Sequence, residues 1–96
     1  MQTDEFEWDD AKAAANLDKH GVGFEEATFA FDDPEALDYV DESDLYPEIR
    51  YKLVARVESK VLIVIYTLRI PRIRIISARE ADENERSDYE SARRTE

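Results

Sequence analysis

The chain has 96 residues and a net charge of −11, with 24 acidic against 13 basic side chains, no cysteine and one histidine. This length supports one domain spanning residues 1–96, and the lack of cysteine excludes disulfides and thiolate metal sites. A single histidine also argues against structural zinc, so we expect no metal and no cofactor. The longest apolar run, Val61–Tyr66, is too short to span a bilayer, and the acidic first residues are unlike a signal peptide. Both features predict a cytoplasmic protein without membrane contact.

The charged residues are unevenly distributed along the chain. Residues 49–79 contain eight Lys or Arg and one acidic residue, a balance of +7, whereas the remainder contains five basic and 23 acidic residues, a balance of −18. Because local potential decides where an anion binds, the net charge does not exclude nucleic acid as a partner. We interpret the acidic remainder as solvated surface. Two alternatives are that it discourages nonspecific RNA binding or that it meets a basic partner.

In the first third of the chain we expect a short strand followed by two helices. Glu5–Trp8 alternates weakly, as a short strand does. Asp9 is a suitable N-cap for a helix over Ala11–His20, and Gly21 suits the left-handed position after it. The i, i+3, i+4 and i+7 spacing of Phe24, Ala27, Thr28 and Phe31 predicts a second short helix over residues 24–31. Four aromatic residues of this region are expected in the core: Trp8, Phe24, Phe29 and Phe31.

From residue 36 onward the apolar period changes to two, which predicts strands. Ala36–Val40 is the first, followed by an acidic loop over Asp41–Pro47. Ile49–Val57 alternates between apolar and mostly basic side chains, so it has one buried face and one basic face. Val61–Leu68 is apolar on both faces, as a central strand is, and Arg72–Ala78 alternates again. Short turns join these last three strands into an antiparallel meander.

The C-terminal segment is predicted to be a helix. Asp82 and Glu85 have the spacing of a capping box, and the helix should run to about Arg93, with Tyr89 packing it onto the sheet. The element order is then β-α-α-β-β-β-β-α. We therefore expect an α+β domain with an antiparallel sheet and with the helices packed on one face.

The basic segment supplies side chains suited to RNA phosphates. Arg50, Lys52 and Arg56 share one side of their strand, and Arg72 and Arg74 share one side of the last strand. Whether the two sets merge depends on strand register. The planar guanidinium of arginine matches phosphate geometry and stays charged. RNA is cleaved without metal when the ribose 2′-oxygen attacks the adjacent phosphorus in line, which requires positioning, charge neutralisation and proton transfer.

Each of these residues also has a purely structural explanation. The cations of the first basic strand can form the solvated side of an amphipathic strand, and those of the last strand can pair with acidic helices or contact a protein partner. Arg79 can form an ion pair with Glu85. His20 is the only side chain whose ordinary pKa lies near neutrality, which makes it a candidate general base. Its position beside Lys19 at a helix C-terminus is equally well explained by capping.

Two groups of residues, near the two ends of the chain, carry a family resemblance. The first comprises Phe6-Glu7-Trp8-Asp9, Lys12, Asn16-Leu17, Lys19-His20-Gly21-Val22 and Phe24-Glu25-Glu26-Ala27. The second comprises Arg69, Arg72-Ile73-Arg74-Ile75-Ile76-Ser77-Ala78-Arg79, Glu85 and Tyr89. Together they resemble the opening and closing signatures of BrnT-family toxins, in the same order and at the same separation, and cover most of the chain.

The resemblance implies a RelE-like fold and a ribonuclease that stops translation, the toxin of a type II toxin–antitoxin pair. Its partner would be a BrnA-type antitoxin with a ribbon-helix-helix domain, and operator DNA would be bound only through that antitoxin. A homodimer within the larger complex is left open. Together with the chemistry above, the resemblance leads us to expect catalytic roles for Arg50, Arg69, Arg79 and His20, and RNA contacts from Lys52, Arg56, Arg72, Arg74 and Lys19.

The chain departs from the family pattern at two places. Ile70-Pro71 stands where a Gly-Asp turn is frequent, and Ala55 stands where glycine is frequent. Pro71 stiffens the turn and Ala55 adds a methyl group, which affects loop geometry and substrate preference more than the fold. These departures and the acidic surface leave a second hypothesis open, a non-catalytic binding module that keeps the antitoxin interface. A general RNA-binding domain fits less well, because it lacks the exposed aromatic platform that stacked bases need.

Overall fold

The computed structural model describes residues 1–41 and 47–94, the last two by backbone alone. The predicted element order is confirmed, with a short 3-10 helix, η1, added after the second helix. Most of the predicted loop Asp41–Pro47 lies outside the described residues. In the described part of the chain, no helix is both long enough and apolar enough to cross a membrane. The elements are β1 (Phe6–Glu7), α1 (Asp10–His20), α2 (Phe24–Thr28), η1 (Phe29–Asp32), β2 (Leu37–Asp41), β3 (Arg50–Val57), β4 (Lys60–Arg69), β5 (Arg72–Glu80) and α3 (Glu83–Arg94).

The strands form one five-stranded sheet in the order β1-β5-β4-β3-β2. β3, β4 and β5 pair antiparallel with their neighbours in sequence, which confirms the predicted meander. β2 pairs antiparallel with β3 at one edge, and the two residues of β1 pair in parallel with β5 at the other edge. The predicted α+β class is therefore confirmed, with a sheet that is antiparallel except at β1.

α1 has the caps that its sequence predicts. The Asp9 side chain accepts a hydrogen bond from the Lys12 N–H at 3.1 Å, and Gly21 takes a left-handed φ of 72° after the last turn. The buried amide of Asn16 donates to the Ala78 carbonyl at 2.7 Å and accepts from the Ala78 N–H at 3.2 Å. This exchange fixes α1 against β5 and satisfies a polar group that would otherwise be costly to bury.

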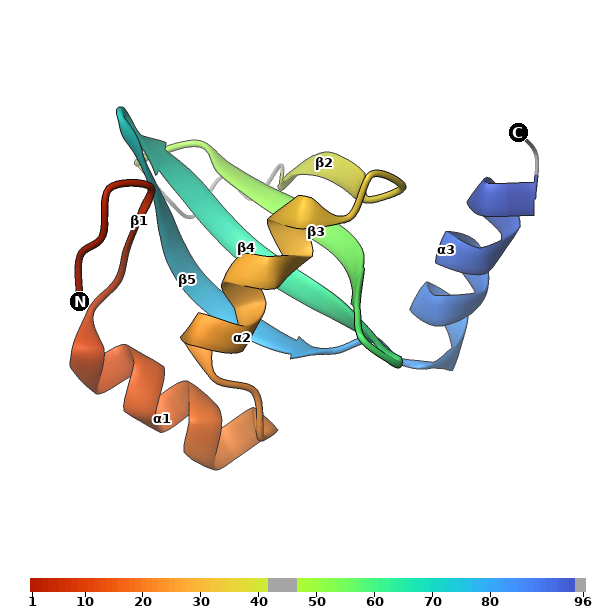
Figure 1. The fold of residues 1–96 in the computed structure, drawn as a ribbon, viewed down its shortest axis with the longest axis horizontal. Helices are drawn as coiled ribbons and strands as arrows, with labels where there is room; N and C mark the ends of the chain where they lie inside the picture. The colour runs from red at the N-terminus through yellow and green to blue at the C-terminus, as the bar shows by residue number, and fades with distance from the viewer. Residues whose placement is uncertain (42–46, 95–96) are drawn as a thin grey trace.

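α1 and α2 lie on the same side of the sheet (Figure 1), and the main core fills the space beneath them. Leu62, Val64 and Tyr66 of β4 belong to this core together with Trp8 and Phe24, whose rings meet edge to face at 6.0 Å. Burial of these apolar side chains is the main stabilising contribution to the domain.

α3 packs on the opposite face, at one end of the sheet (Figure 1). Its capping box is confirmed, since the N–H groups of Asp82 and Glu85 each donate to the other's carboxylate, at 2.9 and 2.8 Å. Tyr89 is 1% exposed and packs against Val54 and Ile63. We expected the helices on one face. α1 and α2 are so placed, whereas α3 takes the other, because β4 is apolar on both faces and offers a second buried patch.

Phe29 is not in the core, contrary to the prediction, and its side chain is 60% exposed. The other three predicted aromatics are buried or packed against the core. Phe29 lies five positions after Phe24, which turns it about 140° away from the buried stripe of a helix. It also begins η1, where the helical period tightens to three.

Candidate functional site

The basic strand residues share one face of the sheet. Along β4, the side chains of Val61, Ile63 and Ile65 point to the face that α3 contacts. Directly opposed residues of neighbouring strands point to the same side, so Lys52, opposite Ile65, and Arg79, opposite Ile63, also lie on this face. We call it the basic face. Its cations are Arg50, Lys52, Arg56, Arg69, Arg72, Arg74 and Arg79.

A β-bulge in β5 is what puts its three arginines on one side. Neighbouring residues 65 and 66 of β4 pair with residues 77 and 75 of β5, which leaves Ile76 as an extra residue. In a regular strand, Arg74 and Arg79 are an odd number of positions apart and would point to opposite faces. The extra residue shifts the alternation. Arg72 and Arg74 therefore join Arg79 on the basic face.

At the end of the basic face near α3, one carboxylate holds two cations. Two guanidinium nitrogens of Arg79 donate to Glu85, at 2.7 and 2.8 Å. The Lys52 Nζ atom lies 3.7 Å from the same carboxylate. The hydrogen bonds from Arg79 lower the pKa of Glu85 to about 2, so this carboxylate is ionised at neutral pH. The ion pair foreseen between Arg79 and Glu85 is thus present.

Arg56 is held by the same helix. Its guanidinium donates to Glu90 at 2.6 Å and lies 5.6 Å from the centre of the Tyr89 ring. The Tyr89 hydroxyl donates to Asp33 at 2.6 Å, and Asp33 also accepts from the backbone N–H of Arg56 at 2.8 Å. α3 is therefore held by its buried Tyr89 ring, whose hydroxyl donates to Asp33, and by its carboxylates Glu85 and Glu90, which pair with cations of the sheet. We refer to Lys52, Arg56 and Arg79 as the α3 end of the basic face.

At the other end, beside the β4–β5 turn, each arginine has a separate partner. Arg69 donates to Glu48 at 3.1 Å, and Arg74 donates to Glu7 of β1 at 2.7 Å. The Arg72 Nε atom donates to a backbone carbonyl of the N-terminal segment at 2.7 Å. We refer to these three arginines as the hairpin end.

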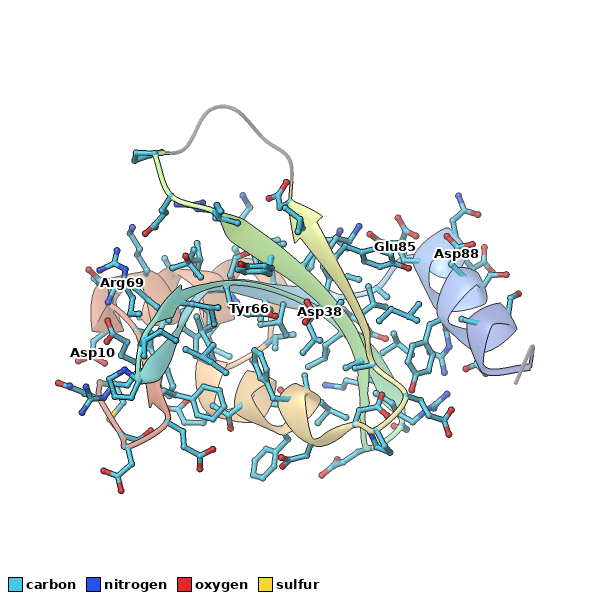
Figure 2. All side chains as sticks on the ribbon, turned by 90° about the horizontal axis from the view of Figure 1, so that it is seen from above. Asp10, Asp38, Tyr66, Arg69, Glu85 and Asp88 are labelled. Carbon is cyan, nitrogen blue, oxygen red and sulfur yellow. The ribbon has the colours of Figure 1, made fainter. Side chains whose placement is uncertain are left out.

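Arg79 and the Arg69–Arg72 pair, at the far tips of the two ends, are too far apart to act on the same phosphate group. Arg79 lies opposite Ile63 and Arg72 lies opposite Arg69, six residues further along β4. At about 3.3 Å per residue, the separation is roughly 20 Å. Figure 2 shows Arg69 and Glu85 at opposite ends of the sheet. An RNA strand that touches both ends must lie along the strands and present different phosphates to each.

Three further predicted residues lie away from these two clusters. Arg50 is half-buried on β3, where its backbone lies opposite that of Asp41 in the edge strand β2. Lys19 and His20 are exposed in the last turn of α1, the helix that covers the opposite face. The structure therefore brings seven of the nine predicted residues, Arg50 included, onto one face. It leaves Lys19 and His20 on α1.

Two side chains near the sheet, Glu85 and Tyr66, have pKa values shifted away from neutrality. Glu85 is ionised, as described above. Tyr66 lies on the core side, where burial and its hydrogen bonds to the Asp38 carboxylate, at 2.8 and 2.9 Å, raise its pKa (Figure 2). Within residues 1–41 and 47–94, no three His, Cys, Asp or Glu side chains are grouped so as to hold a metal ion.

The carboxylates that pair with the basic face were mostly not predicted. Only the pairing of Glu85 with Arg79 was foreseen, because the two residues are close in sequence. Glu7 and Glu48 lie far along the chain from their arginines, and their pairing depends on which strands are neighbours. Glu90 follows Tyr89 directly but points about 100° away from it around α3, so its pairing with Arg56 depends on how the helix lies against β3.

Comparison with known protein families gives one match. A family model described as the ribonuclease toxin BrnT of type II toxin–antitoxin systems matches residues 8–85. The matched range starts directly after β1, ends in the first turn of α3 and contains every cation of the basic face. No curated protein matches the chain.

Proposed function

The chain belongs to the BrnT family of ribonuclease toxins of type II toxin–antitoxin systems, and on that premise we propose that its basic face binds and cleaves RNA. The observation that supports this proposal is the alignment of seven cations from three strands on one face. A sheet face of this kind presents a row of charges to a phosphate backbone. Cleavage of mRNA would then inhibit translation.

The geometry of the α3 end supports the proposal that it acts on a phosphate. Arg79 already binds the two oxygens of a carboxylate through two hydrogen bonds, and a phosphate presents a similar pair of oxygens. When the ribose 2′-oxygen attacks in line, its bond to phosphorus forms as the P–O5′ bond breaks, and negative charge grows on the phosphate oxygens. Water takes the proton of the 2′-hydroxyl and supplies one to the departing 5′-oxygen. A guanidinium fixed at this position stabilises that charge, with Lys52 adding a second cation. RNA phosphate would compete with Glu85 for these groups.

The hairpin end is suited to holding the neighbouring phosphates. Arg69 is 49% exposed in its side chain and makes one contact with Glu48. Exposed ion pairs of this kind contribute little to stability and exchange readily. Arg69 would therefore attract the RNA, with Arg72 and Arg74 beside it along the strands, while Arg79 acts on the scissile phosphate.

Because the family belongs to type II toxin–antitoxin systems, the expected protein partner of this chain is an antitoxin. We propose that this antitoxin has a ribbon-helix-helix domain of the BrnA type and that operator DNA is bound through it. The chain itself is acidic outside the basic face, which disfavours direct contact with DNA.

The proposal is tested with purified protein, a structured mRNA and a cell-free translation reaction. The wild-type chain should cleave the RNA in the presence of a chelator and stop protein synthesis. Lys12→Ala is the control for substitutions of basic-face cations, because it removes an exposed cation from α1, away from that face. Intact RNA with the wild-type chain, or loss of cleavage in the control, would contradict the proposed site.

A non-catalytic binding module is the second candidate function. It is favoured by the observation that at least five cations of the basic face already have carboxylate partners. Such a module would bind the antitoxin and leave RNA intact. The same cleavage assay, with antitoxin binding measured in parallel, distinguishes the two functions.

A further inference from the structure

A groove borders the α3 end of the basic face, between the α2–η1 segment and the β3–β4 hairpin. Its volume is about 680 Å³. Phe29, Pro34 and Val57 supply its apolar surface, and Phe29 is the aromatic residue that is 60% exposed. The other lining residues are charged: Glu26, Asp32, Asp33, Arg56 and Glu58.

The groove is acidic around its apolar surface. Four of its charged residues are carboxylates, and the one cation, Arg56, is engaged by Glu90 of α3. Glu26 makes a single long contact of 3.6 Å with Lys60. The side chains of Asp32 and Glu58 are exposed. This charge disfavours RNA and anionic lipid surfaces, and it favours a cationic ligand.

The backbone of Glu58, one of the residues that line the groove, has an unusual conformation. Glu58 is the first residue of the two-residue loop that joins β3 and β4, where Val57 pairs with Lys60. Its φ is +56°, in the left-handed region that such loops normally fill with Gly or Asn. A glutamate at this position carries backbone strain. The strained residue is one of those that line the groove, which links the local conformation to the charge of this surface.

We infer that this groove is a docking site for a basic segment of the antitoxin, with one large apolar side chain packed against Phe29 and flanking Lys or Arg residues paired with Glu58 and Asp32. The inference rests on the family assignment, which supplies the partner. The described residues 1–41, which include Glu26 and Asp32 of the groove, carry 13 acidic and two basic side chains. A partner segment of complementary charge is therefore rich in Lys or Arg. The exposed ring supplies the apolar anchor that tight interfaces need.

The groove borders the network that anchors α3. Asp33 lines the groove and also accepts the hydrogen bond from Tyr89, and Arg56 lines it while pairing with Glu90. A segment seated in the groove therefore contacts the residues that hold α3 on the basic face. Docking there leaves the hairpin end uncovered, so binding at this groove and RNA contact at Arg69 are separable by mutation.

The test measures the affinity of the full chain for the BrnA-type antitoxin proposed above, by calorimetry at two salt concentrations. Phe29→Ser and Glu58→Gly should each weaken binding at least tenfold, and wild-type affinity should fall as salt rises. Glu58→Gly removes the strain as well as the charge, so its Tm should equal or exceed that of the wild type. A loss of binding in this variant is therefore not explained by unfolding.

Leu17→Ser is the matched control, because Leu17 is an apolar residue of α1 with a similar exposure of 53%. It should bind as the wild type does. Wild-type affinity in both groove variants overturns the inference, and so does the absence of binding by the wild-type chain. Sedimentation that shows a dimer of this chain which Phe29→Ser disrupts also overturns it. RNA cleavage is followed in parallel. Uncleaved RNA with Phe29-dependent binding would contradict the proposed function and support the docking site.

Discussion

At the α3 end of the basic face, one helix supplies the carboxylates that engage the cations, whereas at the hairpin end each arginine has a partner from a different segment. Arg79 and Glu85 are 40% and 18% exposed in their side chains, and Arg79 donates two hydrogen bonds to the carboxylate. Arg69 and Glu48 are 49% and 32% exposed and are joined by one contact. Two-point binding fixes the orientation of a guanidinium, and one-point binding at an exposed site does not. The α3 end is therefore suited to act on one phosphate, and the hairpin end to attract the strand.

This difference separates effects on rate from effects on affinity. A fixed donor that meets charge developing in the transition state lowers the barrier to reaction. An exposed cation that neutralises a phosphate mainly strengthens binding, and its effect depends on salt. Substitutions at the two ends should therefore be distinguishable by kinetics.

The largest effect is expected at the α3 end. Arg79→Ala should lower the rate constant of RNA cleavage by about 10²–10³-fold, as loss of one preorganised donor does, with a smaller change in KM. Single-turnover cleavage measures the rate, and a melting curve checks that the variant is folded. A cleavage rate within threefold of the wild type would show that Arg79 does not contact the scissile phosphate.

Removing the competing carboxylate should act in the opposite direction. Glu85→Gln takes away a negative charge beside Arg79 and Lys52, so RNA affinity should rise by about fivefold, which corresponds to about 1 kcal/mol of relieved repulsion. The same change should destabilise the fold by about 1–2 kcal/mol, because a charged hydrogen bond is lost. Fluorescence anisotropy and urea unfolding measure the two quantities.

Glu83→Gln is the control for this prediction. It makes the same charge change in the first turn of α3 at an exposed position. Its RNA affinity should stay close to that of the wild type. An equal gain in both variants would assign the effect to net charge and not to the carboxylate on Arg79.

A smaller effect is expected at the hairpin end. Arg69→Ala should weaken RNA binding by about threefold and leave the cleavage rate of bound RNA nearly unchanged. Because one phosphate contact is lost, the slope of log Kd against log salt should fall by about 0.7 for single-stranded RNA. A titration at several salt concentrations measures this slope. An unchanged slope would place RNA away from this end.

The dependence of stability on pH gives the smallest effect. The folded-state pKa of Glu85, about 2, lies below its ordinary value of 4.5, so the unfolded state binds more protons in this range. The contribution of the pair is complete above about pH 4.5 and is lost as the pH falls toward 2. Wild type should lose about 1 kcal/mol more than Glu85→Gln between pH 5 and 3, allowing for solvent screening. Parallel unfolding curves would contradict this.

The elements and caps of this fold follow from local patterns. Asp9 and Gly21 delimit α1, and Asp82 with Glu85 begins α3, because caps act over three or four residues. The prediction that Phe29 is buried was wrong, because the sequence around it does not reveal that the α-helix changes to η1 at this residue.

The site is less predictable because it depends on register. Regular alternation places Arg72 and Arg74 together and Arg79 on the opposite side, and only the bulge at Ile76 unites them. No residue type in this segment marks that bulge. The carboxylates on Arg69 and Arg74 likewise come from distant segments, so their pairing is a consequence of the tertiary fold.

The most direct test of the central claim is a footprint of bound RNA on the folded chain. A 2′-O-methyl RNA cannot be cleaved by attack of the 2′-oxygen, so it stays bound while hydrogen exchange and crosslinking map its contacts. The basic face predicts protection along β3, β4 and β5 and crosslinks at Arg69 and Arg79. Protection confined to α1 around Lys19 and His20, with β3–β5 unchanged, would contradict it.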